Sequence, residues 1–297
     1  MSAIHPLADA DALGPRLHGL APDEQRFAES MARNGVAVID LGPEAAALCD
    51  RATAETAPMF RRGGANRVQD AWRRSRAVRR LASHPEILRM LRAAYGREPF
   101  PFQTLNFERG TEQPLHSDTI HFNSEPAGFM CGVWIALEDV DPRAGPLLYQ
   151  PGSHRLPVVG MHDVGVNGLP TMADYARLYE PRFQERLDAA GLPTRRLLLR
   201  KGQAFAWAAN LAHGGAPIDD PRLTRRSLVV HFYFKGGLYY TPRLSDEPGG
   251  RLYVRLPSNI ITGGWEWPRR DGRRVRLGAR QVLGALRARL LRRAPQE

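Results

Sequence analysis

One short polar run, QPLHSDTIHF at residues 113–122, carries residue types that could hold a metal ion. A strand near residues 115–122 would project His116 and Asp118 from the same face, because side chains two residues apart on a strand point the same way. With one further histidine, such a pair forms the 2-His-1-carboxylate facial triad that binds Fe(II) and leaves coordination positions open. A His-x-Asp tripeptide alone is weak evidence, and a chance polar cluster is the alternative.

The second half of the expected site lies in the run AFAWAANLAHGGAPIDDPRLTRRSLVVHFYF, residues 204–234. His213 is expected just after a strand and before a Gly-Gly turn, where its side chain can reach a barrel mouth as the third ligand. Further along, Arg225 and Ser227 lie two residues apart and would face the same side of a strand, so a guanidinium and a hydroxyl can bind one carboxylate together. The two runs together predict a metal site beside a carboxylate-binding group.

The remaining histidines and aromatic residues of these runs have simpler interpretations. His121, His154 and His231 are expected to be core or loop histidines, each with a satisfied structural role. Trp207 alternates with Phe205 on a predicted strand and is expected to belong to the core rather than to a cofactor pocket. The chemistry is therefore assigned to the three candidate ligands and to the arginine and serine that follow them.

Four runs, in this order, resemble the phytanoyl-CoA dioxygenase family of Fe(II)/2-oxoglutarate-dependent oxygenases: LHSDTIHF, GVWIALEDVDPRAGPLLYQPGSHR, AWAANLAHGG and TRRSLVVHFYF. The resemblance extends over about residues 25–235. It implies a double-stranded β-helix, a distorted jelly roll of two facing sheets with iron at one open end. By position, it implies that His116, Asp118 and His213 are the iron ligands.

The same resemblance implies a co-substrate site. Arg225 lies six residues before the His231–Phe232 pair and corresponds to the arginine that binds the distal carboxylate of 2-oxoglutarate. Ser227 resembles the accompanying hydroxyl, and Trp134 and Asn106 resemble positions that line the co-substrate pocket. The implied cofactors are Fe(II), 2-oxoglutarate and O2, and the implied reaction hydroxylates a C–H bond with release of succinate and CO2.

Asp118 narrows the range of reactions that the resemblance allows. Related halogenases have a small residue at this position so that chloride can bind iron, and the carboxylate here disfavours halogenation. Hydroxylation is expected, with desaturation, epoxidation and ring closure as alternatives. The expected substrate is a small molecule: a secondary metabolite, an amino-acid derivative or a sugar-containing compound. A non-catalytic cupin-like metal-binding or sensor protein is the competing hypothesis. Such a protein would not need Arg225 and Ser227 to bind a co-substrate.

These residues must be positioned by a β-rich core. From Phe100 onward, short β-branched and aromatic runs alternate with Gly, Pro and Asp, which is typical of a sandwich or barrel. With the family resemblance, the expected fold is mainly β with flanking helices, a double-stranded β-helix of the jelly-roll, cupin-like type. The expected helices are residues 24–34, 44–54, 70–82 and 85–95, and the expected strands are residues 35–42, 102–107, 115–122, 130–138, 146–150, 196–199, 204–207 and 227–235.

We expect one domain over residues 1–297, because neither a repeat nor a low-complexity linker divides the sequence. Its helical part occupies about residues 1–99, its jelly-roll core about residues 100–235, and a C-terminal extension residues 236–297. Residues 156–194 interrupt the core with a mostly helical insertion. This insertion is too long for a hairpin loop and is a candidate lid over the site.

The chain carries a formal net charge of +11, and nearly all of its basic residues are arginine. This bias, with abundant alanine and glycine, is typical of a GC-rich bacterial genome. Arginines cluster within residues 73–80 and 269–293, which we interpret as a solvated helix face and a basic tail. An anionic substrate met by residues such as Arg62 or Arg76 is the alternative hypothesis. Total charge alone does not predict a nucleic-acid-binding protein, which needs a contiguous basic face.

The sequence also indicates where the protein is found. Cys49 and Cys131 lie in apolar surroundings and are expected to be buried thiols rather than a disulfide. The N-terminal segment is acidic where a secretory signal is basic and apolar, and the longest apolar stretch is too short to span a bilayer. A last helix near residues 281–293 is expected to pack on its own domain. We therefore expect a cytoplasmic protein without a membrane span, and no feature of the sequence indicates its oligomeric state.

Overall fold

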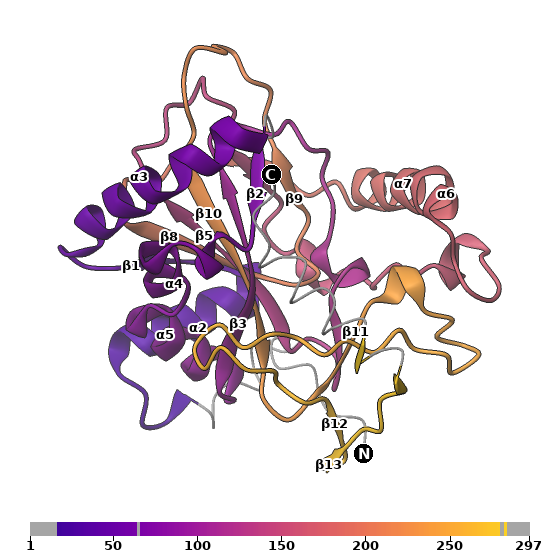
Figure 1. Cartoon of the computed structure of the whole chain (residues 1–297). Coiled ribbons are helices and arrows are strands. Elements are labelled where there is room, and N and C mark those ends of the chain that lie inside the picture. The colour runs from indigo at the N-terminus through magenta and orange to yellow at the C-terminus, as the bar shows by residue number, and fades with distance from the viewer. Residues whose placement is uncertain (1–16, 64–65, 280–281, 284–297) are drawn as a thin grey trace.

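A six-stranded antiparallel sheet forms the centre of the molecule (Figure 1). The computed structural model describes residues 17–63, 66–279 and 282–283. The strand order is β1-β8-β5-β10-β3-β2, so neighbours in the sheet come from distant parts of the chain. The strands are β1 (Val36–Asp40), β8 (Gln203–Ala208), β5 (Met130–Ala136), β10 (Ser227–Phe234), β3 (Pro99–Phe107) and β2 (Arg67–Gln69).

A smaller three-stranded sheet, of order β7-β6-β9, packs against one face of the large sheet. Leu147 and Leu197 of the small sheet share an apolar cluster with Trp134 and Phe205 of the large one. The rings of Tyr149 and Phe205 lie 4.9 Å apart across this interface. The strands of the small sheet are β7 (Arg195–Leu197), β6 (Leu147–Tyr149) and β9 (His213–Gly215), and two further pairs are formed by β4 (Asn123–Glu125) with β11 (Leu238–Tyr240) and by β12 (Arg269–Arg270) with β13 (Arg273–Arg274).

Four helices cover the opposite face of the large sheet, as Figure 1 shows. The strands alternate accordingly: on β10, Leu228, Val230 and Phe232 lie in the core beneath the helices. Val229 and His231 point to the other side, toward the open end of the sheets. The predicted architecture, mainly β with flanking helices, is confirmed. The helices are α2 (Pro22–Asn34), α3 (Ala45–Gly63), α4 (Arg76–Ala82) and α5 (Pro85–Tyr95).

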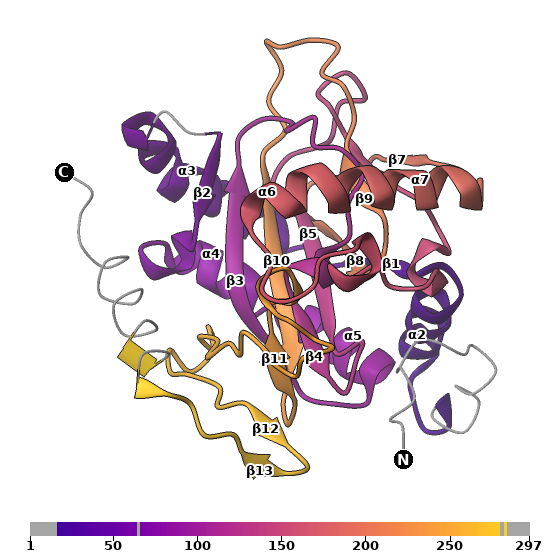
Figure 2. The same cartoon turned by 90° about the vertical axis from the view of Figure 1, so that its right-hand side faces the viewer.

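The insertion is mostly helical, as predicted, and lies on the side of the large sheet away from the four helices (Figure 2). Its buried residues Tyr179 and Phe183 share an apolar cluster with Ile120 and Ala212. These two residues belong to the sequence runs 113–122 and 204–234, which contain the predicted iron ligands. The insertion is thereby packed beside the predicted iron ligands. Its elements are η5 (His162–Val164), α6 (Met172–Asp174), the π-helical turn η6 (Tyr175–Tyr179) and α7 (Glu180–Ala190).

The predicted strand at residues 115–122 is wrong. Only an isolated bridge joins His116 to His213, and a 3-10 helix, η3 (Asp118–Ile120), follows it. Ser117 causes this change, because its hydroxyl accepts a backbone hydrogen bond and caps the 3-10 helix. His213, expected after a strand, instead begins β9.

The other predicted elements agree with the structure apart from their ends. The helix predicted at residues 44–54 continues to Gly63. The helix predicted at residues 70–82 divides into the turn η2 (Ala71–Arg73) and α4. Ser75 causes this division, because its hydroxyl accepts a hydrogen bond from a backbone N–H of the first turn of α4 and so starts a new helix.

Two predictions about the chain as a whole can be compared with the described residues. Cys49 and Cys131 are both buried and free, as expected. Within the described ranges, every helix is too short or too polar to cross a bilayer. Apart from residues 282–283, the helix predicted at residues 281–293 lies outside the described part of the chain.

Candidate metal centre

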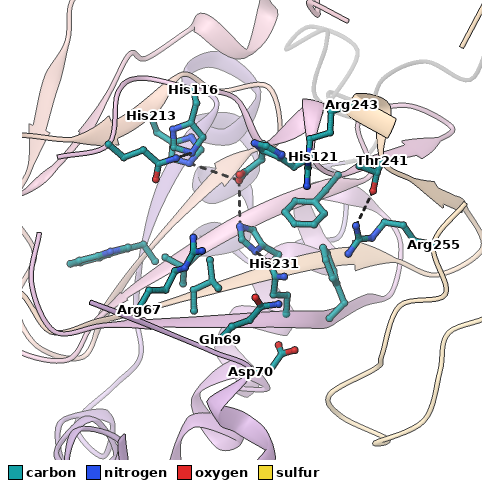
Figure 3. A pocket seen from close by; sticks show the side chains of 18 of the residues that line it. Arg67, Gln69, Asp70, His116, His121, His213, His231, Thr241, Arg243 and Arg255 are labelled. Atoms are coloured by element: carbon teal, nitrogen blue, oxygen red, sulfur yellow. Dashed lines mark hydrogen bonds and ion pairs between the residues drawn. The ribbon is translucent and has the colours of Figure 1, made fainter. Parts of the chain in front are cut away.

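The three predicted metal ligands lie together in the wall of a large cavity. The candidate ligand atoms of His116, Asp118 and His213, which we call the metal triad, lie within 4.8 Å of one another. Nε2 of His213 is 3.9 Å from Oδ2 of Asp118, and the centroids of the two imidazole rings are 4.4 Å apart. Figure 3 shows the two histidines side by side. Two imidazoles and one carboxylate in this arrangement fit a non-haem iron ion with open coordination positions.

Backbone pairing brings the two histidines of the metal triad together. His116 and His213 oppose each other in the antiparallel bridge and exchange backbone hydrogen bonds of 2.9 and 3.0 Å. Directly opposed residues project their side chains on the same side. Nδ1 of His116 lies 3.0 Å from the carbonyl oxygen of Pro114, and Nδ1 of His213 lies 3.0 Å from that of Leu211. These bonds favour a proton on Nδ1, so the lone pair of each Nε2 is available to a metal.

Asp118 reaches the triad by a different route. The capped 3-10 turn, rather than strand parity, directs its carboxylate toward the histidines. This residue is 4% exposed, and its Oδ2 accepts a hydrogen bond of 2.8 Å from Nε1 of Trp207. Nε2 of His231 lies 3.6 Å from the same oxygen. These two neighbours hold the carboxylate in one orientation, as outer partners of metal ligands usually do.

Trp207 therefore does more than fill the core, which is the role that its alternation with Phe205 predicts. Its ring packs in the apolar cluster between the sheets, while its indole N–H donates to the metal-ligand carboxylate. Gly132 on the neighbouring strand β5 makes room for the ring, because a Cβ at this position would overlap the indole. A glycine inside a strand indicates such a close approach, and this was the available signal in the sequence.

Replacing Trp207 with phenylalanine should lower Fe(II) affinity by about 10- to 100-fold, the usual effect of losing an outer partner of a metal ligand. Most of the ring packing is retained, and the hydrogen bond to Asp118 is lost. Competition against a chromogenic chelator measures the affinity. Trp72→Phe is the matched control, because its indole bonds to Asp70 at 3.3 Å and not to the triad. Unchanged affinity in Trp207→Phe would contradict the assigned role.

Gly132→Ala should destabilise the fold by about 1–3 kcal/mol, as overpacking of a core does, and should also weaken Fe(II) binding by displacing Trp207. Gly264→Ala is the control, since its added methyl group would meet nothing nearer than 3.5 Å. Thermal unfolding and the chelator competition together measure both effects. Equal losses of melting temperature in the two variants would show that the overlap with the indole is not the cause.

Burial and neighbouring side chains set the protonation states of His116 and Asp118. Removal of water lowers the pKa of His116 to about 3, and the neighbouring His213 adds to this effect. Burial alone would raise the pKa of Asp118, but the adjacent histidines, His213 foremost, lower it to about 2. At neutral pH, His116 is therefore neutral and Asp118 is ionised. These are the forms that metal binding requires.

A cavity of about 1010 Å³ opens at the metal triad, and Arg225 is part of its wall. Arg225 is 4% exposed and donates from Nη1 to the carbonyl oxygen of Gly145 at 2.9 Å, while its Nε has no partner among the described residues. Desolvation lowers the pKa of Arg225 to about 10. A buried guanidinium without a carboxylate is unfavourable unless a ligand supplies one, so its surroundings fit the predicted anion site.

The other residues predicted for the co-substrate site differ in their positions. Trp134 lines the cavity, with its ring centroid 5.7 Å from Cζ of Arg225. Ser227 lies on the cavity side of β10, and its buried hydroxyl has no partner in the described part of the chain. Asn106 is not brought to the cavity. Its register partner Leu228 belongs to the core beneath the helices, so strand pairing turns Asn106 to that face.

His231, expected to be a core or loop histidine, instead lines the cavity. Besides its contact with Asp118, its Nδ1 lies 3.0 Å from Oε1 of Gln103. His231 has the same strand parity as Ser227, so both lie on one face of β10. This parity was the signal in the sequence that could have identified it.

The other two histidines behave differently from each other. His121 lines the cavity, and its Nε2 lies 3.3 Å from the hydroxyl of Tyr175 in the insertion. Desolvation lowers the pKa of His121 to about 4. His154 is buried away from the cavity, with its Nε2 3.1 Å from the carbonyl oxygen of Ala32, which agrees with the predicted core role.

Two segments outside the sheets complete the cavity wall. The insertion contributes Met172, Tyr175 and Glu180, which supports its predicted role as a lid. Residues from the C-terminal segment 241–265 form a further part of the wall, although no motif in the sequence indicates it. We call this segment the C-terminal wall.

The arginines in the cavity are not those that the sequence hypothesis named. Arg67 and Arg73 line it, whereas Arg76 is exposed and lies outside it. The side chain of Arg62 lies outside the described residues. Of the arginine cluster within residues 73–80, Arg73 lines the cavity and lies before the start of α4. The arginines on the exposed face of α4 do not line it.

Two facing antiparallel sheets with a His–Asp–His cluster at one open end define the class of double-stranded β-helix oxygenases that use non-haem iron and 2-oxoglutarate. The family model of phytanoyl-CoA dioxygenase (PhyH) matches residues 36–227, and the chain belongs to this family. The match includes the metal triad, Arg225 and Ser227, but not the C-terminal wall. Iron and 2-oxoglutarate are accordingly the cofactors, as predicted.

Several solved structures have a similar fold. SnoK, a non-haem α-ketoglutarate-dependent carbocyclase from nogalamycin biosynthesis, has 18% identity and a TM-score of 0.59 over 74% of this chain and 87% of its own. EctD from S. alaskensis, solved with 2-oxoglutarate and 5-hydroxyectoine, has 18% identity and a TM-score of 0.55 over 78% and 83%. The non-haem monooxygenase ThoJ has 18% identity and a TM-score of 0.56 over 90% and 95%. No curated protein matches the sequence.

Proposed function

We propose that this oxygenase hydroxylates an unactivated C–H bond of a small molecule and releases succinate and CO2. The observation that carries the proposal is that the ligand atoms of the metal triad lie within 4.8 Å of one another in a cavity that Arg225 also lines. A protein that only bound a metal would not need a buried guanidinium without a carboxylate partner. Arg225 therefore argues against the alternative of a non-catalytic cupin-like sensor.

Each residue of the site has its own role in this mechanism. The metal triad would hold iron, which together with 2-oxoglutarate supplies the activation of O2 for C–H oxidation. Arg225 and Ser227 would bind the distal carboxylate of 2-oxoglutarate, with Trp134 packed beside them. Trp207 would keep the carboxylate of Asp118 oriented through its hydrogen bond. The apolar cluster between the sheets would exclude water from this end of the cavity.

Hydroxylation is the reaction that we favour among those open to this class. Asp118 occupies the position that a halide would need on the metal, which argues against halogenation. One protein of similar fold is named a carbocyclase. Ring closure, desaturation and epoxidation each need a substrate that is held in an orientation which prevents simple hydroxylation. The product mass separates hydroxylation and epoxidation, which each add one oxygen atom, from ring closure and desaturation, which each remove two hydrogen atoms. NMR of the product then distinguishes an alcohol from an epoxide.

The size and lining of the cavity favour a small-molecule substrate. Its volume of about 1010 Å³ is at the upper end of ligand pockets, which range over roughly 300–1,000 Å³, so co-substrate and substrate can fit together. Apolar residues such as Phe102, Leu105 and Phe122 alternate with arginines in its wall. This mixture suits a secondary metabolite, an amino-acid derivative or a sugar-containing compound that carries polar groups.

Anaerobic titration tests the proposed function without knowledge of the substrate. Addition of 2-oxoglutarate to the Fe(II)-loaded protein should produce a weak visible charge-transfer band, because the keto acid chelates the iron. Succinate is the matched control ligand, since it lacks the keto group and should produce no band. A folded protein that shows no band at saturating Fe(II) and 2-oxoglutarate would overturn the proposal. Succinate release coupled to candidate substrates then identifies the substrate.

A further inference from the structure

We propose that Arg243 and Arg255 of the C-terminal wall form a binding subsite for an anionic group of the substrate, a carboxylate or a phosphate. The inference rests on the proposed function, because it names the kind of molecule that the oxygenase takes. Both arginines line the same cavity as the metal triad. Neither belongs to the co-substrate site around Arg225, so their charges are available to a second ligand.

Arg255 is held in place by two neighbours that do not neutralise its charge. Its Nη1 donates to Oγ1 of Thr241 at 2.8 Å, the contact drawn in Figure 3. Its guanidinium carbon lies 4.8 Å from the centroid of the Phe122 ring, a cation–π contact. The planar guanidinium is thus oriented before any ligand binds. Such an orientation favours charge-assisted hydrogen bonds to a planar anion.

Among the described residues, Arg243 likewise forms no salt bridge. The acceptor that it contacts is Sδ of Met172 in the insertion, at 2.8 Å, and a thioether is a weak acceptor. Across the described ranges, neither Arg243 nor Arg255 forms an ion pair, and Nε of each is buried without a partner. The acidic residues nearest in sequence, Asp246 and Glu247, are bonded to other side chains. Within the described part of the chain, neither cation therefore forms a salt bridge with a carboxylate.

The resulting excess of positive charge predicts an anionic ligand. A partly buried cation without a counter-ion is unfavourable, and a bound carboxylate or phosphate would offset this through charge-assisted hydrogen bonds. Glu180 of the insertion also lines the cavity, but it pairs with neither Arg243 nor Arg255 in the described structure. This end of the cavity is therefore suited to an acid rather than to an amine.

A substrate bound at these arginines would extend toward the metal triad. The Phe122 ring centroid lies 4.8 Å from Cζ of Arg255 and 5.0 Å from the ring centroid of His231. Nε2 of His231 is in turn 3.6 Å from Oδ2 of Asp118. Figure 3 shows His231 between the two triad histidines and Arg255. A small molecule with an acid at one end could lie along Phe122 and present a C–H bond to the metal at the other.

The location of the subsite in the chain agrees with a role in substrate choice. The family match covers residues 36–227, which contain the residues of the shared chemistry. Arg243 and Arg255 lie beyond that match. The chemistry and the recognition of the substrate would therefore come from different segments of the chain.

Benzoate, benzamide and inorganic phosphate test the subsite. The protein is loaded anaerobically with Fe(II) and saturating 2-oxoglutarate so that Arg225 is occupied, and binding is measured by calorimetry. The wild type should bind benzoate or phosphate at least about tenfold more tightly than uncharged benzamide, and the tighter anion identifies the class of acid. R243Q/R255Q should lose this preference. R76Q, which changes an exposed arginine outside the cavity, should keep it.

Two results would overturn the subsite: no preference for either anion over benzamide in the wild type, or a preference that survives in R243Q/R255Q. If that variant does not fold, R243K/R255K replaces it, since lysine keeps the charge without the planar fork and should reduce the preference partly. The charge-transfer band of the same samples separates the two proposals. A band without anion preference rejects the subsite alone, and an anion preference without a band rejects the proposed function alone.

Discussion

Substitution of His213 by alanine should abolish turnover and weaken Fe(II) binding by more than about 100-fold, because a direct metal ligand contributes more than the 10- to 100-fold of an outer partner. Alanine retains the backbone bridge to His116, so the strand pairing that positions the remaining ligands is preserved. The imidazole is lost and Asp118 keeps its hydrogen bond to Trp207. Competition with a chelator measures the affinity, and succinate release measures turnover.

His162→Ala is the matched control for this experiment. His162 is an exposed histidine of the insertion, and the described cavity lining does not include it. Its removal should leave both iron affinity and succinate release unchanged. If His213→Ala bound Fe(II) as tightly as the wild type, its imidazole would not be a ligand and the metal triad would have to be reassigned.

Arg225→Gln should raise the KM for 2-oxoglutarate by about 100-fold or more, which is the scale of removing one partner from a buried charged pair. Fe(II) affinity should change little, because Arg225 is not a member of the metal triad. In the absence of 2-oxoglutarate, the variant should be as stable as the wild type or more stable, since it removes a buried cation whose Nε has no partner in the described chain. Initial rates and thermal unfolding measure these effects.

Arg226→Gln is a close control, because it changes the next residue in the chain. Arg226 is 37% exposed at its side chain and pairs with Glu138 at 2.9 Å. Its loss should leave the KM for 2-oxoglutarate unchanged and reduce stability by at most about 1 kcal/mol, as for other partly exposed ion pairs. Equal increases of KM in the two variants would mean that Arg225 has no special role in binding the co-substrate.

The cavity divides into a part that serves the shared chemistry and a part that this chain adds. The metal triad and Arg225 lie on the two packed sheets or directly next to them. The antiparallel bridge positions His116 and His213, and the capped 3-10 turn positions Asp118. Arg225 lies two residues before the start of β10. The insertion and the C-terminal wall supply side chains from helices and loops that cover the open end. Sites on rigid strands can keep a precise geometry, whereas loops can vary with the substrate.

Much of the site could be predicted because it depends on residue types and their order. Two histidines and a carboxylate are the typical ligand set of non-haem Fe(II) oxygenases, and the spacing of Arg225 and Ser227 predicts that both side chains face the same way. Seven of the eight strands that the sequence pattern predicted lie near observed strands, and the four predicted helices lie near observed helical segments. The short strands β2, β4, β9, β11, β12 and β13 were not predicted. The helices, the strands and the spacing of Arg225 and Ser227 are local features, so a single stretch of sequence contains the information that determines each of them. Grouping His213 with His116 and Asp118 depended instead on the order of the runs that resemble the family.

Contacts between distant segments were decided only by the tertiary structure. The bridge between His116 and His213, the hydrogen bond from Trp207 to Asp118, and the wall at residues 241–265 each join parts of the chain that no local pattern relates. Asn106 illustrates the same limit, because the pairing of β3 with β10 determined which face it occupies. Strand register and loop packing depend on the whole core, and a shift of one residue reverses every side chain on a strand.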